Sequence, residues 1–152
     1  FPRCANIQRC RQPIEIYMDG SLLNLLIAND HILYGKGLGN AILKKAPNRF
    51  SINYTEDFES TLFFLSSNNI DLIILDFQMP KGDLIYTVTS IKEKWPTIRI
   101  ILNGMLSKAS LKYFPSILTE LDGLLSFVSS EDVYINAIDK VMGGGLYFYL
   151  PH

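Results

Sequence analysis

The sequence predicts an α/β fold in which five parallel strands alternate with five helices in a doubly wound sheet. Short apolar runs rich in branched residues recur along the chain, as expected of strands buried on both faces of a parallel sheet. Segments with helical spacing separate these runs, and such crossovers join parallel strands. The chain has 152 residues, of which 48% are hydrophobic and 19% charged, enough for one domain with a full core.

Five segments have the strand pattern, and the third is the clearest. In the third, Leu-Ile-Ile-Leu runs unbroken between Asp71 and Asp76, and Pro80 follows shortly after. The first strand leads into an acidic turn, Asn29-Asp30-His31. The predicted strands are 22–28, 50–54, 71–76, 98–102 and 123–127.

Five helices are predicted between and after these strands, over 31–45, 55–69, 84–94, 111–121 and 130–142. Three glycines in the first helix should each weaken it by up to about 1 kcal/mol relative to alanine. Thr55 is expected to open the second helix, and Pro115 marks either a kink or the first turn of the fourth. Ser130 has the character of an N-cap, and Gly143-Gly-Gly145 ends the last helix.

The expected strand order is the flavodoxin-like 2-1-3-4-5. In this order the first and third strands flank the point where the winding reverses, so Asp30 and Asp76 should meet at the carboxyl edge of the sheet. Two carboxylates with a nearby backbone carbonyl suit Mg²⁺, which keeps several waters. Asp76 would then be a nucleophile for a phosphoryl group. Alternatively, Asp30 caps the helix that follows it.

Composition excludes several classes of function. The net charge of −1 gives no electrostatic basis for this segment to bind nucleic acid. No apolar run has the length of a membrane span, and no signal peptide is evident. Both cysteines, Cys4 and Cys10, lie in a leader, 1–20, that we expect to be poorly ordered. This pattern is typical of the reducing cytoplasm. Since Phe1 is not methionine, we expect the chain to have been cut at its start.

Over residues 22–150 the sequence resembles response-regulator receiver domains, and in particular the NarL/LuxR-type subgroup with a helix-turn-helix output domain. The resemblance is carried by Ala-Asn-Asp-His at 28–31, Leu-Asp-Phe-Gln-Met-Pro at 75–80, Trp-Pro at 95–96, Asp-Gly at 122–123 and Gly-Gly-Gly-Leu-Tyr-Phe at 143–148. It implies a phospho-acceptor at Asp76, a metal-ligating acid at Asp30, and a third Mg²⁺ ligand in the Gln78 carbonyl. The phosphoryl donor would be a phosphohistidine of a partner histidine kinase.

The sequence departs from the receiver pattern at several pocket positions. Asn29 replaces a second acidic residue. The hydroxyl residue that ends the fourth strand falls at Gly104, next to Asn103. Phe127 stands where the family has lysine, and Leu124 where it has an aromatic switch residue. The loop after Pro80 is also one residue short.

These departures predict a degenerate receiver that signals largely without phosphorylation. The missing lysine alone would supply a charge-assisted bond of roughly 1.5–3 kcal/mol to the phosphoryl group. A ligand with no differential affinity for two states shifts neither of them. Phe127 either fills the space of the lysine and holds the loop after the fourth strand in one state, or turns into the core. The alternative function is a conventional receiver phosphorylated at Asp76 with Mg²⁺.

We expect signalling to act through dimerisation, as a homodimer or as a heterodimer with another regulator. Aromatic residues, which are enriched at interfaces, gather on the predicted fourth and fifth helices and the tail: Tyr113, Tyr134, Tyr147, Phe148 and Tyr149. The alternative is that they only pack the core and tail. The expected organisation is a leader at 1–20, a receiver at 21–145, and from 146–152 the start of a linker to a DNA-binding output domain absent from this chain.

Two enzymatic alternatives share this fold. A flavin carrier needs a phosphate-binding loop rich in Ser, Thr or Gly after the first strand. Here that loop is acidic and contains no glycine. A phosphatase acting through Asp76 needs a general acid two residues later, and Gln78 cannot serve. We therefore expect no enzymatic activity.

Overall fold

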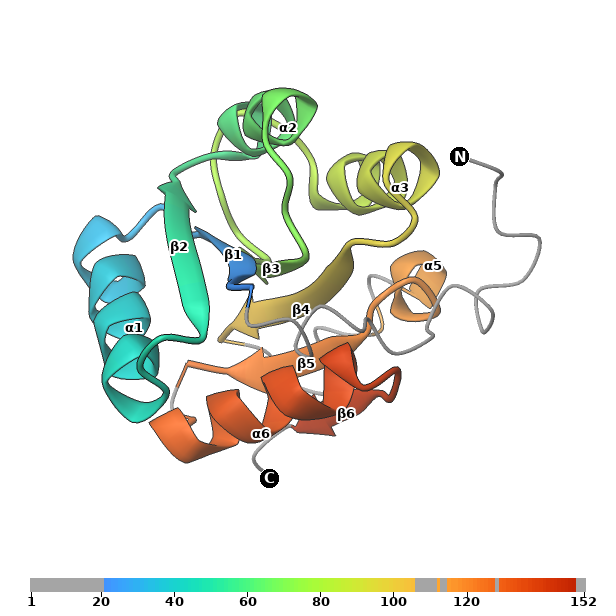
Figure 1. Cartoon of the computed structure of the whole chain (residues 1–152). Coiled ribbons are helices and arrows are strands. Elements are labelled where there is room, and N and C mark those ends of the chain that lie inside the picture. Colours follow the sequence, from blue (N-terminus) through green and yellow to red (C-terminus); the bar gives the residue numbers. More distant parts are fainter. Residues whose placement is uncertain (1–20, 106–111, 113–114, 128, 150–152) are drawn as a thin grey trace.

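The computed structural model describes residues 21–105, 112, 115–127 and 129–149, and within them a parallel sheet has helices on both faces (Figure 1). The strand order is β2-β1-β3-β4-β5-β6. The strands are β1 (Leu23–Ala28), β2 (Phe50–Thr55), β3 (Leu72–Asp76), β4 (Arg99–Gly104), β5 (Gly123–Ser126) and β6 (Tyr147–Tyr149). The helices are α1 (Ile32–Lys45), α2 (Phe58–Ser67), α3 (Leu84–Lys94), α5 (Pro115–Leu118) and α6 (Glu131–Met142).

The prediction of five strands was wrong by one, whereas the order of the first five is confirmed. Residues Tyr147–Tyr149 pair in parallel with β5, and the Tyr147 N–H donates to the Asp122 carbonyl at 3.0 Å. The turn between α6 and β6 passes through Gly144, whose φ of 91° favours glycine. A strand of three residues at a sheet edge is too short to show alternation, so the sequence placed it within 146–152 as a tail.

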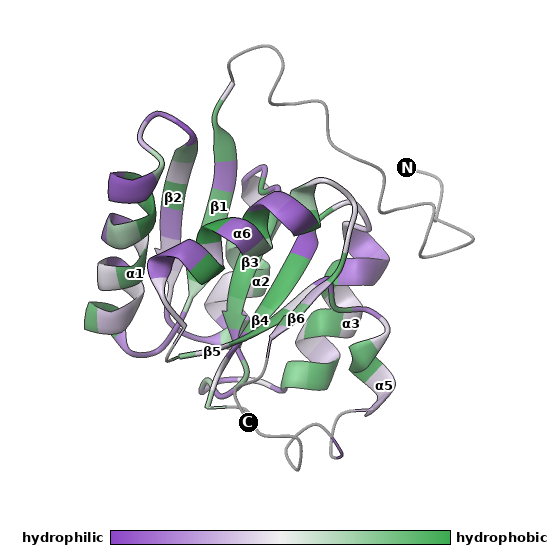
Figure 2. Ribbon diagram, turned by 90° about the horizontal axis from the view of Figure 1, so that it is seen from below, coloured by the Kyte–Doolittle hydropathy of each residue, from purple (hydrophilic) through white to green (hydrophobic). Residues whose placement is uncertain are grey.

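The sheet separates two hydrophobic layers. Strand residues alternate between them: Ile73 and Leu75 pack under α2, α3 and α5, whereas Leu72 and Ile74 pack under α1 and α6. Figure 2 shows the apolar colouring concentrated on the strands and on the helix sides that cover them. Among the described residues no helix is both long and apolar enough to cross a membrane.

Two helix starts differ from, or refine, the expectation. Thr55 ends β2 instead of opening a helix, and Asp57 is the N-cap of α2. The Thr55 hydroxyl bonds the Thr61 hydroxyl at 2.7 Å, which explains why a threonine suits the buried end of this strand. Pro115 is the first residue of α5, so it is a first-turn proline and not a kink. Leu111 and Phe114 of that predicted helix lie outside the described residues.

Gly39 has a packing role that helix propensity does not reveal. A Cβ atom at this position would collide with the ring and hydroxyl of Tyr54 on β2. The glycine therefore lets α1 lie close against the edge strand β2. The cost in helix propensity is offset by this close approach.

A buried ion pair joins α3 to the edge of the sheet where the strands begin. The Lys92 ammonium lies 2.9 Å from the Asp122 carboxylate, and the Asp122 side chain is completely buried. The same carboxylate accepts the Ile100 N–H at 2.9 Å, and Lys92 also donates to the Ile98 carbonyl at 2.7 Å. These bonds fix α3, which follows the loop carrying Gln78, relative to β4 and β5.

We expect Lys92→Met to lower the free energy of unfolding by about 3–5 kcal/mol, because it removes the ammonium that lies 2.9 Å from the completely buried Asp122 carboxylate. Lys94→Met, two residues away on the same helix, is the matched control and should change stability little. Urea denaturation followed by circular dichroism measures both. Equal stability of the two variants would contradict this role of the pair.

Candidate functional site

Asp76 is the last residue of β3 and lies at the carboxyl edge of the sheet, as the sequence predicts for a strand of this length. Its side chain is buried, and Oδ1 accepts the Gln78 N–H at 3.0 Å. The register pairs Asp76 with Asn103 on β4, and the Phe77 N–H donates to the Asn103 carbonyl at 3.0 Å. The backbone on both sides of Asp76 is therefore held by the sheet.

Asp30 lies close enough to Asp76 to influence its ionisation. Burial raises the pKa of Asp76 to about 6, the Gln78 amide opposes this rise, and the nearby Asp30 charge adds to it. The His31 charge opposes the rise as well; its Nε2 lies 3.8 Å from Asp30 Oδ1. The crossovers thus bring two carboxylates to one edge, where together with a carbonyl they offer the oxygen ligands that Mg²⁺ prefers.

Asp30 does not cap α1. The N-cap residue is His31, and no side-chain hydrogen bond caps this helix. Asn29, which is buried, instead uses its Oδ1 to accept the His31 N–H at 2.8 Å. Asn29 thus shapes the turn as a neutral residue, and the Asp30 carboxylate is left to the pocket.

The short loop after Met79 is docked on the first turn of α2, a feature that the sequence analysis missed. The Pro80 and Lys81 carbonyls accept the N–H groups of Phe58 and Glu59 at 3.2 and 3.1 Å. Positive φ angles at Lys81 (57°) and Gly82 (142°) turn the chain there. The missing residue in this loop was the only available signal. Docking fixes the segment whose Gln78 N–H binds Asp76.

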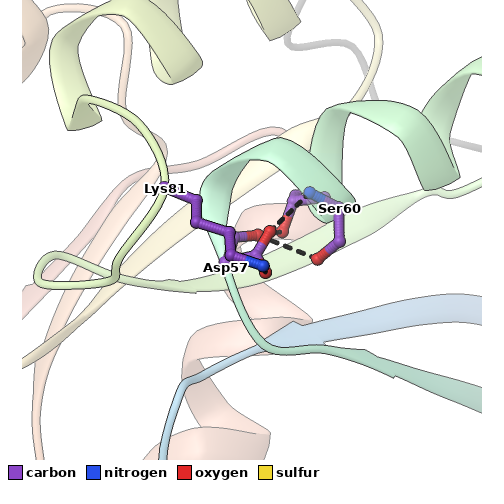
Figure 3. A network of polar contacts seen from close by, with 4 residues as sticks. Asp57, Ser60 and Lys81 are labelled. Carbon is purple, nitrogen blue, oxygen red and sulfur yellow. Dashed lines mark hydrogen bonds and ion pairs between the residues drawn. The ribbon is translucent and has the colours of Figure 1, made fainter.

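An ionic cap reinforces this docking (Figure 3). Asp57 accepts the Ser60 N–H at 2.6 Å, and the Lys81 ammonium lies 3.8 Å from the same carboxylate. The Ser60 N–H and, to a smaller extent, the Lys81 charge hold the pKa of Asp57 below its usual value. Lys81 therefore lies beside the α2 cap.

An apolar groove opens beside Asp30, and Gln78 is among the residues that line it. Its lining contains no lysine or arginine: Asp30, Phe58, Phe77, Gln78, Met79, Pro80, Gly82, Asp83, Leu84 and Ile85. Among the described residues no three His, Cys, Asp or Glu side chains group as a metal cage. A cation here would rely on two carboxylates, a carbonyl and water.

The position that the sequence analysis matched to the family's hydroxyl residue is sterically closed. Gly104 has a φ of 153°, which favours glycine, and a Cβ there would collide with the Phe77 ring. The neighbouring Asn103 is buried, and its Oδ1 accepts the Tyr134 hydroxyl at 2.9 Å. A glycine at position 104 is therefore sterically required by the phenylalanine that follows Asp76.

Phe127 is half-buried, so it does not turn fully into the core. Its half-buried ring packs on Tyr34 of α1, with centroids 4.7 Å apart and planes inclined by 55°. It lines a groove between α1 and α6, and it is not among the residues that line the groove beside Asp30. Most of the loop after β4, which Phe127 was expected to restrain, lies outside the described residues. Leu124 is buried in the core under α2, α3 and α5.

The predicted interface aromatics fall into different environments. Tyr134 is buried, so it is a core residue of α6 and not an exposed contact. Tyr147 is half-buried, whereas Phe148 and Tyr149 are exposed on β6. Tyr113 lies outside the described residues. Sequence periodicity placed Tyr134 on the apolar stripe of its helix but gave no sign of the polar partners of its hydroxyl.

Comparison with known proteins supports the resemblance found in the sequence. No family model matches the chain. It is 25% identical over 128 residues to the transcriptional regulatory protein DegU of Brevibacillus brevis, which covers 84% of this chain and 53% of that protein. It is 24% identical over 127 residues to a glycerol metabolism activator of Pseudomonas putida, covering 83% of this chain and 57% of that protein. The chain thus spans about half the length of these relatives.

Solved structures place the fold among response-regulator receiver domains. The non-phosphorylated receiver domain of the stress response regulator RcsB from Escherichia coli superposes with a TM-score of 0.74 at 21% identity, covering 86% of this chain and 100% of that one. The isolated receiver domain of RcsB from Salmonella enterica serovar Typhimurium, solved with phosphomimetic BeF₃⁻, gives 0.71 at 21% identity, over 85% and 94% of the two chains. The receiver fold inferred from the sequence is confirmed.

The raised pKa of Asp76 predicts a pH-dependent effect of Asp76→Asn on stability. Because the folded pKa, about 6, exceeds the usual 3.8, the folded state is most stable below about pH 4, where Asp76 is protonated, and it loses stability as the pH rises through 6. Above pH 6 the buried charge costs about 3 kcal/mol. Urea denaturation should therefore show the variant more stable than the parent at pH 8 and equally stable at pH 4.

The control for this measurement is Asp132→Asn, which removes an exposed carboxylate from the first turn of α6. Its effect should differ little between the two pH values. If the stability difference between Asp76→Asn and the parent is the same at pH 4 and pH 8, burial does not raise the pKa of the Asp76 carboxyl.

Proposed function

We propose that this chain is the receiver domain of a NarL/LuxR-type response regulator, and that it is an atypical one that signals largely without phosphorylation. The observation that carries the proposal is the state of the Asp76 edge. Two acids are brought together there, whereas the hydroxyl position is closed by Phe77 and the lysine position is a phenylalanine packed on α1. The residues that would bind metal and accept phosphate are present, whereas the residues that would respond to a bound phosphoryl group are replaced.

The input residues retain a defined chemistry. Asp30, Asp76 and the Gln78 carbonyl would hold Mg²⁺ weakly, since one acid of the family pattern is Asn29. The ion would offset the repulsion between the two carboxylates and let an anion approach Asp76. A partner histidine kinase is the donor proposed for any phosphoryl group that reaches this residue.

The replaced residues that would respond to a phosphoryl group are the reason to propose signalling without phosphorylation. A phosphoryl group shifts a conformational equilibrium only by its differential affinity for the two states. In the family pattern that difference comes from a hydroxyl, a lysine and an aromatic ring. Gly104, Phe127 and Leu124 supply none of these contacts, because their positions are closed, turned to α1 or buried in the core.

Dimerisation is the proposed output. Structures of RcsB include two dimers of that protein bound to two parallel DNAs. In the present chain Ile32 and Leu33 are exposed at the start of α1, and Leu33 also lines the groove between α1 and α6 that contains Phe127. We propose that this face forms a homodimer, or a heterodimer with another regulator, in the cytoplasm. DNA binding would require an output domain beyond this chain.

The alternative is a conventional receiver phosphorylated at Asp76 with Mg²⁺. It is favoured by the pairing of Asp76 with Asp30, which retains the metal-binding part of the site. An enzymatic role is less well supported. Gln78 donates its backbone N–H to Asp76, and its amide side chain cannot act as the general acid of a phosphatase.

We expect Mg²⁺ to bind weakly to the parent chain and at least about tenfold more weakly to Asp30→Asn, because a divalent ion loses one of two charged ligands. Asp132→Asn removes a carboxylate that is more exposed (73% against 34% for Asp30) and pairs with Lys45 of α1, and it should bind as the parent does. Isothermal titration calorimetry at pH 8 measures the affinities. Equal affinities for all three proteins would remove the metal site from the proposal.

We expect sedimentation velocity at high micromolar concentration to show a dimer whose abundance does not change when Mg²⁺ and beryllofluoride are added. Asp76→Asn should sediment as the parent does, because the proposed dimer does not depend on a ligand at this residue. A dimer that forms only with beryllofluoride would favour the conventional receiver. A monomer under both conditions would refute dimerisation as the output.

A further inference from the structure

Three polar side chains form a continuous hydrogen-bond chain from α1 to the strand beside Asp76. The Tyr34 and Tyr134 hydroxyls lie 3.0 Å apart, and the Tyr134 hydroxyl lies 2.9 Å from Asn103 Oδ1. Asn103 and Tyr134 are each only 1% exposed, whereas Tyr34 is partly exposed on α1. Burying three polar groups in an otherwise apolar layer is costly unless each is paired.

The direction of the protons along this chain follows from their number. Tyr134 has one hydroxyl proton, and it is donated to the amide oxygen of Asn103. The Tyr134 oxygen must therefore accept from Tyr34, which donates its own proton inward. Burial raises the pKa of Tyr134, so its hydroxyl stays protonated and remains a donor.

This polarity determines what Asn103 can offer. Its amide oxygen faces Tyr134, so Nδ2, which has two N–H donors, points away from Tyr134. Asn103 and Asp76 are register partners on neighbouring parallel strands, so their side chains leave the same face of the sheet. Asp76 Oδ1 also lies 3.4 Å from the place that a Cβ at Gly104, the residue next to Asn103, would take.

We propose that Asn103 is the group that contacts a phosphoryl-type anion at Asp76, and that Tyr134 and Tyr34 are the positioning residues that hold its amide with the N–H donors toward the anion. The inference rests on the proposed function, because it assumes an anion with Mg²⁺ at the Asp76 edge. A neutral amide would replace the missing hydroxyl and lysine as the donor. The same chain polarises the amide, since a bond accepted at Oδ1 strengthens donation from Nδ2.

The test compares anion and metal affinities in matched variants, with beryllofluoride as the probe. Tyr134→Phe removes the positioning hydroxyl, and Asn103→Asp keeps an oxygen for Tyr134 but replaces the N–H donors by a carboxylate. We expect beryllofluoride to bind about tenfold more weakly to Tyr134→Phe and at least about tenfold more weakly to Asn103→Asp. Mg²⁺ alone should bind Tyr134→Phe as it binds the parent.

Tyr54→Phe is the control, because it removes a half-buried hydroxyl beside α1 that takes no part in the Tyr34–Tyr134–Asn103 hydrogen-bond chain. It should leave the beryllofluoride affinity unchanged. A second readout uses ¹³C at Cζ of the tyrosines, with the Tyr34 resonance assigned from Tyr34→Phe. Beryllofluoride should shift the Tyr34 resonance in the parent and in Tyr54→Phe but not in Tyr134→Phe, an effect that a purely structural role would not produce.

The outcomes separate this inference from the proposed function. Unchanged beryllofluoride affinity in Tyr134→Phe, or an equal loss of Mg²⁺ affinity, would overturn the positioning role. If the parent binds Mg²⁺ but no beryllofluoride, the inference fails and the metal site stands. If the parent binds neither, the input site of the proposed function fails as well.

Discussion

The buried carboxylate of Asp76, with Asp30 beside it, is the constraint on which the arrangement of the site depends. A charge removed from water needs partners, and the folded protein supplies the Gln78 N–H at 3.0 Å and the nearby His31. These partners do not cancel the cost, since the pKa of Asp76 is raised. A proton or a cation at the site would therefore stabilise the buried carboxylate, and this is the electrostatic basis for binding a metal ion.

The side chains around this carboxylate pack against and bond to one another. Phe77 occupies the space that a side chain at residue 104 would need, so the glycine at 104 and the ring after Asp76 are sterically matched. Phe127 packs on Tyr34, whose hydroxyl pairs with that of Tyr134. The side of the pocket toward α1 and α6 is thus rebuilt from rings and neutral hydrogen bonds. On the other side, the docked Pro80–Lys81 segment restrains the loop after β3.

Much of the fold follows from local patterns in the chain. The apolar run before Asp76 is too short and too branched for a helix between its two aspartates, and the helical stretches around it require parallel crossovers. Those two facts were enough to place Asp30 near Asp76. Thr55 was misassigned because its hydroxyl is satisfied by Thr61 across a turn, a bond that propensity does not describe. The strand Tyr147–Tyr149 was missed because three residues carry no readable period.

The sequence by itself identified the first five strands and the residues at their carboxyl ends, because hydrophobic periodicity acts over neighbouring residues, and the rules for doubly wound sheets then gave the parallel order. Only the tertiary structure decided where Phe127 packs, why residue 104 must lack a side chain, and that Asn103 is bonded by a tyrosine 31 residues away. Those features depend on contacts between side chains from different elements. Such contacts are set by packing density and by the pairing of buried polar groups, neither of which leaves a periodic signal.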